Sequence, residues 1–231
     1  MRTLCYHSVN DVDKNYITVS AQNFRAQMKF LSEESYRTIG LNDLVDGQAD
    51  GKSIVITFDD GYRDNYENAL PIMKEFGFKG TIFCIGEKIG QVGYLTKEQI
   101  AEMVKSGFEF GSHTLSHRDL PALSAEEKWN EIKVSKSFLS NELQLEIDYF
   151  CYPRGLYDQE SIELIKKAGY RAACSNTPGS NGISKNGKKI DPYLLKRTEI
   201  GAIDTVDDFR KKLAGAYDLI HKALHAVRGR P

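Results

Sequence analysis

The stretch SIVITFDDGY, residues 53–62, joins two segments of opposite chemistry. Its first half is a run of apolar and β-branched residues, which is the composition of a buried strand. Two adjacent carboxylates, Asp59 and Asp60, then stand directly before Gly61. Like charges side by side repel, so the pair needs either solvent around both acids or a cation beside them. A solvated turn and a metal site are therefore both open at this point.

Short apolar runs alternate with amphipathic stretches on both sides of this segment. The alternation favours parallel βαβ units around a central sheet or barrel, an α/β fold. The predicted strands are Thr3–Tyr6, Ser53–Phe58, Gly80–Ile85, Phe108–Gly111, Tyr149–Tyr152 and Ala172–Cys174. The predicted helices are one capped by Ser20, then Asn65–Phe76, Lys97–Ser106, Ala125–Leu143, Gln159–Ala168 and Asp207–Val227, with Trp129, Ile132, Phe138 and Leu139 as core candidates of the longest.

Length and charge limit the classes of protein to consider. The 231 residues are enough for one sizeable core, and we expect a single catalytic domain over residues 1–231, with residues 176–191 as a surface loop. A formal net charge of -1 gives no electrostatic reason to expect nucleic acid as a partner. No apolar run approaches a membrane span, and the first residues do not read as a signal peptide. We therefore expect a cytoplasmic protein, with a trimmed exported protein as the alternative.

The cysteines Cys5, Cys84, Cys151 and Cys174 contain no CxxC pair, which argues against a zinc ribbon or a thioredoxin-like centre. Three of them have apolar or aromatic neighbours, so buried reduced thiols are favoured over disulfides.

Polar groups follow four of the predicted strands, where functional residues gather in parallel α/β folds. His7 follows the first strand, the two aspartates follow the second, His113 and His117 follow the fourth, and Tyr152-Pro153-Arg154 follows the fifth. The histidines are spaced i, i+4, which on a helical turn would present both rings to one side. With one carboxylate they form a set suited to zinc or another divalent metal with an open position.

Neither motif is decisive alone. An aspartate pair before glycine is an ordinary turn, and HxxxH recurs in this chain at His221 and His225, where a helix C-terminus explains it better. A division of labour would explain the pair at 59–60: one aspartate binds the metal and the other acts as a base.

Together, TFDDG (57–61) and SHTLSH (112–117) resemble the first two motifs of the polysaccharide deacetylases, the NodB homology or carbohydrate esterase family 4 proteins. The segments KGTIFCIG and GFEFGSHTLSH strengthen the resemblance, which covers about residues 52–169. It implies a distorted (β/α)7-type barrel and one divalent metal ion, zinc first, with cobalt or nickel as alternatives. It further implies that Asp60, His113 and His117 bind the metal and that Asp59 is the general base for a metal-activated water.

The chain departs from the family pattern at three places. The family's late Leu-x-His, which supplies the general acid, is missing, and LCYH (4–7) matches the opening Tyr-His of a subgroup related to biofilm exopolysaccharide deacetylases; His7 is therefore assigned as the acid. The family's Arg-x-Pro-Tyr reads CYPR (151–154), so Cys151 replaces the arginine that holds the base. Arg154 or Arg197 is expected to supply that charge, or else to be a surface or substrate-binding arginine. Tyr152 is a third substrate-binding candidate. The family's acetyl-pocket motif is not found.

These observations predict a hydrolase that removes the N-acetyl group from an N-acetylated amino sugar or glycan of the N-acetylglucosamine type. Two alternatives stay open: a non-catalytic carbohydrate-binding module on the same fold, and a hydrolase of another amide such as an N-formyl sugar.

Overall fold

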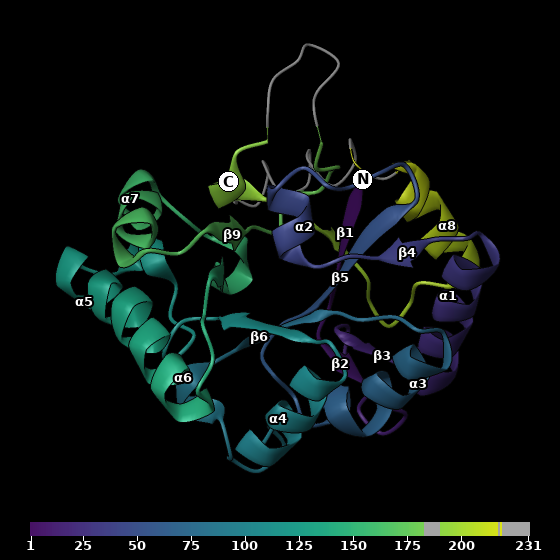
Figure 1. Cartoon of the computed structure of the whole chain (residues 1–231), viewed down its shortest axis with the longest axis horizontal. Helices are drawn as coiled ribbons and strands as arrows, with labels where there is room; N and C mark the ends of the chain where they lie inside the picture. The colour runs from purple at the N-terminus through teal and green to yellow at the C-terminus, as the bar shows by residue number, and fades with distance from the viewer. Residues whose placement is uncertain (183–189, 217, 219–231) are drawn as a thin grey trace.

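A curved parallel sheet with helices on its outer side organises the molecule (Figure 1). The computed structural model describes residues 1–182, 190–216 and 218. Seven strands follow one another in the order β10-β1-β5-β6-β7-β8-β9, β4 pairs with β5, and β2 (Ser8–Val9) and β3 (Thr18–Val19) pair separately. The main strands are β1 (Arg2–Tyr6), β4 (Arg37–Thr38), β5 (Ser53–Phe58), β6 (Thr81–Cys84), β7 (Glu109–Ser112), β8 (Tyr149–Cys151), β9 (Ala172–Cys174) and β10 (Thr198–Glu199).

The segment that ends in β10 closes this sheet into a ring. Its first residue, Leu195, forms a parallel bridge with Cys174 of β9, and its amide donates to the carbonyl of Ala173 at 2.9 Å. Three residues later, Thr198 pairs with Leu4 of β1. One segment thus joins the two edges of the sheet, and the predicted (β/α)7-type barrel is confirmed.

Strand residues alternate between the inside of the barrel and the layer beneath the helices. Ile54, Ile56 and Phe58 of β5 belong to the outer core, whereas Val55 belongs to a separate inner cluster. This period of two follows from the pleat of a strand. The inner cluster comprises Leu41, Leu44, Val55, Phe83, Tyr149, Cys151, Ala172, Cys174 and Leu195.

The helices lie at the periphery and cover the outer face of the strands (Figure 1). Ser20 caps the first helix as expected, since its hydroxyl accepts the amide of Asn23. Two stretches are π-helical, η1 (Asn65–Ala69) and η4 (Asn130–Val134), and η2 (Gly86–Lys88), η3 (Leu120–Ala122), η5 (Pro153–Gly155) and η6 (Pro192–Leu194) are short 3₁₀ turns. The α-helices are α1 (Ala21–Glu33), α2 (Leu41–Val45), α3 (Leu70–Glu75), α4 (Lys97–Lys105), α5 (Ala125–Trp129), α6 (Ser135–Leu143), α7 (Gln159–Ala168) and α8 (Val206–Ala214).

The stretch Ala125–Leu143 is helical throughout, as predicted, and contains the π-helical turn η4 between α5 and α6. Two other details of the predicted helices were wrong. Phe138, predicted to be core, is 37% exposed. The helix predicted to start at Asp207 corresponds to α8, which ends at Ala214 because Gly215 adopts a left-handed conformation, φ 86°. The remainder of its predicted span, with His221 and His225, lies outside the described residues apart from residues 216 and 218.

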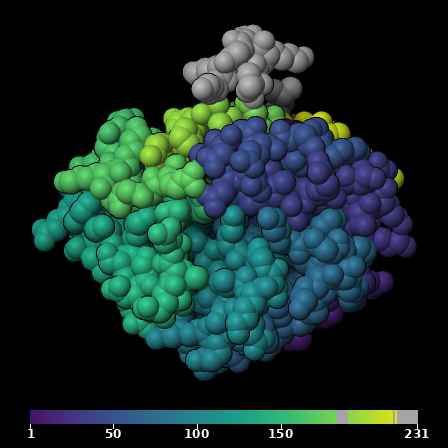
Figure 2. Space-filling model, viewed as in Figure 1, coloured from purple at the N-terminus to yellow at the C-terminus, as the bar shows by residue number. Residues whose placement is uncertain are grey.

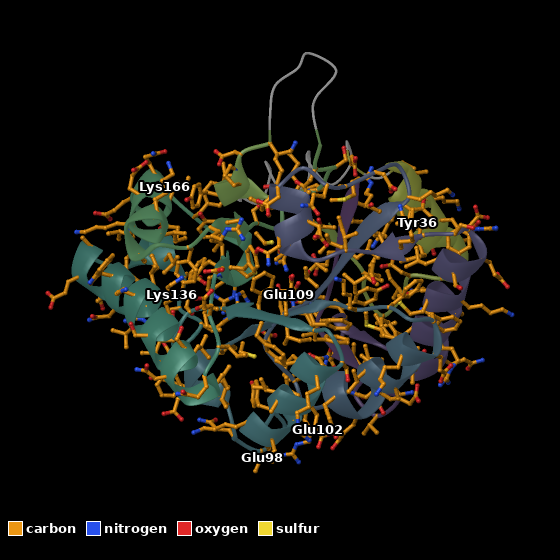
Figure 3. The ribbon with its side chains drawn as sticks, in the orientation of Figure 1. Tyr36, Glu98, Glu102, Glu109, Lys136 and Lys166 are labelled. Atoms are coloured by element: carbon orange, nitrogen blue, oxygen red, sulfur yellow. The ribbon has the colours of Figure 1, made fainter. Side chains whose placement is uncertain are left out.

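The N-terminal ends of the strands are closed by α2. Glu109 at the start of β7 accepts hydrogen bonds from the amide of Leu41 and the hydroxyl of Thr81, and it lies near the middle of the molecule in Figure 3. In Figure 2 the blue segment around α2 meets green segments near β9, and Arg171 donates to Asp46 at 2.9 Å across this contact. Functional groups therefore have to gather at the opposite end, where the strands finish.

All four cysteines are buried and free, which confirms their prediction as reduced thiols. Within the described residues, no helix combines the length and the apolar character needed to cross a membrane.

Candidate metal and acid–base site

The two aspartates of the opening stretch occupy a tight turn at the end of β5. The amide of Asp59 donates to the carbonyl of Tyr6 at 2.9 Å, which extends the pairing with β1 by one residue. Asp60 and Gly61 then both have positive φ, 70° and 76°. A non-glycine residue in the left-handed region is uncommon, and such residues cluster at functional sites. The turn directs the two carboxylates differently, Asp59 into the barrel and Asp60 toward the histidines.

A cavity of about 380 Å³ opens where the strands end. It collects groups from β1, β5, β7 and the closing segment, so residues distant in the chain share one solvent-accessible space. Its walls are formed by His7, Tyr16, Ile17, Asp59, Asp60, His113, His117, Arg154, Asn176 and Glu199.

Asp60, His113 and His117 form a set with metal-ligand geometry. The Oδ1 atom of Asp60 lies 3.6 Å from Nε2 of His113 and 3.6 Å from Nε2 of His117. Ligand atoms about 2.1 Å from a tetrahedral zinc ion are separated by about 3.4 Å, so the observed spacing fits such an ion. Three protein ligands also leave the fourth position open, as catalytic zinc sites require. The donor types fit a divalent transition metal.

The loop that carries the two histidines is not helical, contrary to one form of the i, i+4 expectation. Thr114 and His117 have positive φ, 67° and 65°, and the loop turns back on itself through them. The amide of His117 donates to the hydroxyl of Thr114 at 2.8 Å. The two imidazole rings meet edge to face with centroids 4.7 Å apart. Turn geometry rather than helical spacing brings the rings together.

The environment of His113 keeps its ring neutral and oriented. Burial lowers the pKa of His113 to about 4, against the opposing effect of the nearby Asp59 carboxylate. Nδ1 lies 2.8 Å from the carbonyl of Cys151 and therefore carries the proton that it donates there. This leaves the Nε2 lone pair directed at Asp60, which is the tautomer that a metal ligand needs.

Asp59 is held by Arg197, a residue of the segment that closes the barrel. Nη1 donates to Oδ1 at 2.6 Å and Nη2 donates to Oδ2 at 2.7 Å, and Arg197 is only 1% exposed. Burial alone would raise the pKa of Asp59, but Arg197, His113 and His7 hold that pKa well below its usual range. Arg197 thus lies beside Asp59, as expected if it supplies the charge of the arginine that Cys151 replaces. Because Arg197 is buried, it is not a surface arginine.

Two thiols complete the surroundings of Asp59. The Sγ atoms of Cys5 and Cys151 lie 3.6 and 3.5 Å from its Oδ2. Burial raises the pKa of both thiols well above the ordinary value, so both stay protonated and donate to the carboxylate. Asp59 could also join a metal-ligand group with Cys5 and His7, or with His113 and Cys151. In both groups, however, Arg197 already donates hydrogen bonds to the two carboxylate oxygens of Asp59. The set of Asp60, His113 and His117 is therefore the better metal site.

His7 lies on the other side of Asp59. Its Nε2 is 3.9 Å from Oδ2 of Asp59, and its side chain is 14% exposed at the cavity wall. Its Nδ1 is buried without a hydrogen-bond partner among the described residues. The side-chain amide of Asn65 donates to the His7 carbonyl at 2.8 Å and fixes the backbone there.

The two other predicted substrate-binding residues, Arg154 and Tyr152, lie on different sides of the sheet, and only Arg154 lines the cavity. Arg154 lines the cavity, has a positive φ of 54°, and forms an ion pair with Asp119. The side chain of Tyr152 instead points to the outer face of the sheet, and its hydroxyl donates to the carbonyl of Tyr193 at 3.1 Å. The structure does not bring the Tyr152 side chain to the cavity, because a residue one position after Cys151 points to the opposite face of the sheet.

Four cavity residues were missed by the sequence reasoning: Tyr16, Ile17, Asn176 and Glu199. Asn176 accepts a hydrogen bond from Arg197, and Tyr16 is 78% exposed at the rim. The signal for Glu199 was the alternation of Leu195, Arg197 and Glu199, which places all three inside the barrel once the segment is identified as a strand. Tyr62 stacks on Tyr94, with ring centroids 5.3 Å apart.

Comparison with known proteins gives this arrangement a family. A family profile described as polysaccharide deacetylase matches residues 46–173. The protein YxkH of Bacillus subtilis, named as a polysaccharide deacetylase, is 36% identical over 77% of this chain and 64% of its own length. A poly-beta-1,6-N-acetyl-D-glucosamine N-deacetylase of Staphylococcus aureus is 31% identical over 73% of this chain and 66% of its own length. The matches to these two relatives thus span about two thirds of each relative's length.

A solved structure agrees with the fold. BC0361, a polysaccharide deacetylase from Bacillus cereus, superposes with a TM-score of 0.82 at 30% identity, over 92% of this chain and 68% of the other.

Proposed function

The chain belongs to the polysaccharide deacetylase family, and from this premise we propose that it is a metal-dependent hydrolase that removes the N-acetyl group from an N-acetylated amino sugar or glycan. One observation carries the proposal. The Asp60, His113 and His117 ligand set opens into the same cavity as His7 and the ionised Asp59. A carboxylate base, an imidazole acid and a metal site at one location are the groups that amide hydrolysis needs.

We assign Asp60, His113 and His117 as the ligands of one divalent ion, zinc first, with cobalt or nickel as alternatives. When bound, such an ion supplies Lewis-acid polarisation of the amide carbonyl and lowers the pKa of water to about 7. Asp59 accepts the proton of the attacking water. The low pKa of Asp59 keeps this carboxylate ionised across the neutral range, so the base is always in its competent form.

His7 is proposed to donate a proton to the departing amine. Expulsion of an unprotonated amine from the tetrahedral intermediate is unfavourable, so an acid is needed at the side of the cavity opposite the ligand set. The Nε2 atom of His7, close to Oδ2 of Asp59, supports this assignment. It also agrees with membership of the subgroup that opens on Tyr-His, which stays a prediction.

The glycan is proposed to lie along the cavity between Tyr16 and Arg154. An exposed tyrosine ring offers an apolar face to the C–H side of a pyranose, and Glu199, Asn176 and Arg154 supply polar contacts for hydroxyl groups. The Staphylococcus aureus relative is named for poly-N-acetylglucosamine, which supports an N-acetylglucosamine-type substrate.

The test is acyl release from N-acetylglucosamine oligosaccharides by protein stripped with a chelator and then reloaded with zinc or cobalt. Acetate released only by the reloaded protein supports the proposal. Formate from an N-formyl analogue, without acetate, would indicate another amide substrate. Glycan binding without any acyl release would favour a binding module.

A further inference from the structure

Outside the cavity, a buried carboxylate contacts the loop that carries both histidines. Glu131 belongs to the π-helical turn η4 and is 5% exposed. Its Oε2 accepts the amide of Leu115 at 3.0 Å and the amide of Ser116 at 2.9 Å, and its Oε1 accepts the hydroxyl of Ser116. One side chain therefore takes three hydrogen bonds from residues that lie between His113 and His117.

The charge of Glu131 is stabilised by these donors rather than by a cation. Among the described residues, Glu131 forms no salt bridge with lysine, arginine or histidine. A buried carboxylate is costly unless it is well hydrogen-bonded, and bonds to charged acceptors are the stronger ones. The hydrogen bonds that offset the cost of burying Glu131 therefore exist only while the loop keeps this conformation.

Backbone hydrogen bonds also anchor the loop on the opposite side. The amide of His113 donates to Cys84, and the amides of Gly86 and Glu87 donate to the carbonyls of Thr114 and Leu115, at 2.8 to 3.0 Å. These bonds tie the loop to the end of β6. Glu131 holds it from the helix side, so removing the carboxylate leaves two backbone amides without their acceptor.

The same helical region contacts the loop a second time. The hydroxyl of Ser112 donates to the hydroxyl of Ser135 at 2.8 Å, and the amide of Thr114 donates to Ser112 Oγ at 3.2 Å. π-Helical turns inside α-helices are rare and occur often at functional sites. Residues 130–135 thus contact the histidine loop through both Glu131 and Ser135.

We propose that Glu131 is a positioning residue for the metal site, holding the loop so that His113 and His117 keep their Nε2 atoms around Oδ1 of Asp60. The inference rests on the metal site of the proposed function. Residues that orient metal ligands through a hydrogen bond typically change metal affinity by about 10- to 100-fold when they are mutated.

The experiment measures the Kd of Co²⁺ and Zn²⁺ alone for the wild type, Glu131→Ala and Glu131→Gln. Glu131→Ala is expected to weaken binding by about 10- to 100-fold and to alter the visible spectrum of bound Co²⁺. Glu131→Gln is expected to stay close to the wild type. Its amide oxygen can accept both backbone amides, and its NH₂ group can donate to the Ser116 hydroxyl.

Lys128→Met is the matched control. Lys128 lies on α5, three residues before Glu131, is 3% exposed, and pairs with Asp158 and Glu160 rather than with the loop. Its loss should lower the Tm without changing the metal Kd. In the metal-free proteins, hydrogen exchange at the Leu115 and Ser116 amides should accelerate in Glu131→Ala and not in Lys128→Met.

Two results would overturn the inference. One is a wild-type metal Kd in Glu131→Ala. The other is an equal loss of affinity in Lys128→Met, which would show that general helix stability sets the affinity. Failure of the wild type itself to bind either metal would instead remove the metal site, and with it the proposed function.

Discussion

Arg197 and Asp59 are 138 residues apart in the chain and form a two-point ion pair inside the barrel, with N–O distances of 2.6 and 2.7 Å. The guanidinium also donates to the Ser175 carbonyl at 3.0 Å and to Asn176, so it has little freedom to move. Arg197 belongs to the segment that closes the sheet. The same few residues therefore close the barrel and hold Asp59, the proposed base, in place.

Replacing Arg197 should shift the pH dependence of turnover. Without the guanidinium, burial raises the pKa of Asp59, and the carboxylate protonates at a higher pH. The acid limb of kcat/KM is expected to move upward by about 1–3 units in Arg197→Met and by less in Arg197→Lys, which keeps a positive charge. The measurement is kcat/KM between pH 4.5 and 9, with the Tm of each variant recorded beside it. An unmoved acid limb in Arg197→Met would separate Arg197 from the base.

His7→Asn should affect substrates according to their leaving group. Loss of a general acid is expected to cost about 10²- to 10⁴-fold in kcat on an N-acetyl sugar. An aryl acetate needs no proton on its leaving phenolate, so its hydrolysis should fall far less. The comparison uses both substrates with the same metal-loaded preparation. Equal losses on the amide and the ester would assign His7 to another role.

Tyr16→Ala is expected to raise KM for oligosaccharides by about two- to tenfold while leaving kcat nearly unchanged, because it removes a stacking surface remote from the reacting bond. Val12→Ala is the control, since Val12 lies on the same loop, is 83% exposed, and is not part of the cavity wall. Steady-state kinetics on a tetrasaccharide would decide. If both variants behave alike, the tyrosine ring does not contact the sugar.

The metal-free protein should lose stability as the pH falls. The pKa of His113 is about 4 in the folded chain and 6.5 as its ordinary value, so unfolding takes up a proton between these limits. Its contribution is complete above about pH 6.5, declines toward pH 4, and amounts to at most about 3 kcal/mol. The lowered pKa of Asp59 has an effect in the same direction at lower pH. The ionised carboxylate stabilises the fold above pH 3.8, the ordinary pKa of the group, and this stabilisation is lost as the pH falls below that value.

Urea unfolding between pH 8 and pH 4.5 measures this slope. His113→Asn should flatten the profile over that range, whereas a wild-type profile that is already flat would rule out a neutral buried His113.

Much of the barrel was predictable because apolar runs with period two and amphipathic runs with helical period reflect burial directly. The six predicted strands were correct to within a residue or two, as were the predicted ends of α4 and α7. β10 was missed, because two residues carry no period. The same omission hid Glu199 and left open whether Arg197 reaches Asp59.

Backbone conformation limited what could be predicted of the site. Four of the non-glycine residues with positive φ, Asp60, Thr114, His117 and Arg154, lie in the loops that follow β5, β7 and β8. Such conformations are set by surrounding contacts, including those of Glu131, and not by local residue preference. The i, i+4 spacing of the histidines therefore suggested that the two rings lie together, but turn geometry and not a helix brings them there.

The most direct test measures bound metal and acetate release together in the wild type, Asp59→Asn, and the double variant Asp60→Ala, His117→Ala. The account predicts one divalent ion and acetate release in the wild type, one ion without turnover in Asp59→Asn, and neither in the double variant. Loss of the metal from Asp59→Asn would make Asp59 a ligand instead of the base. A metal-loaded wild type that releases no acetate from any N-acetylated glycan would contradict the account.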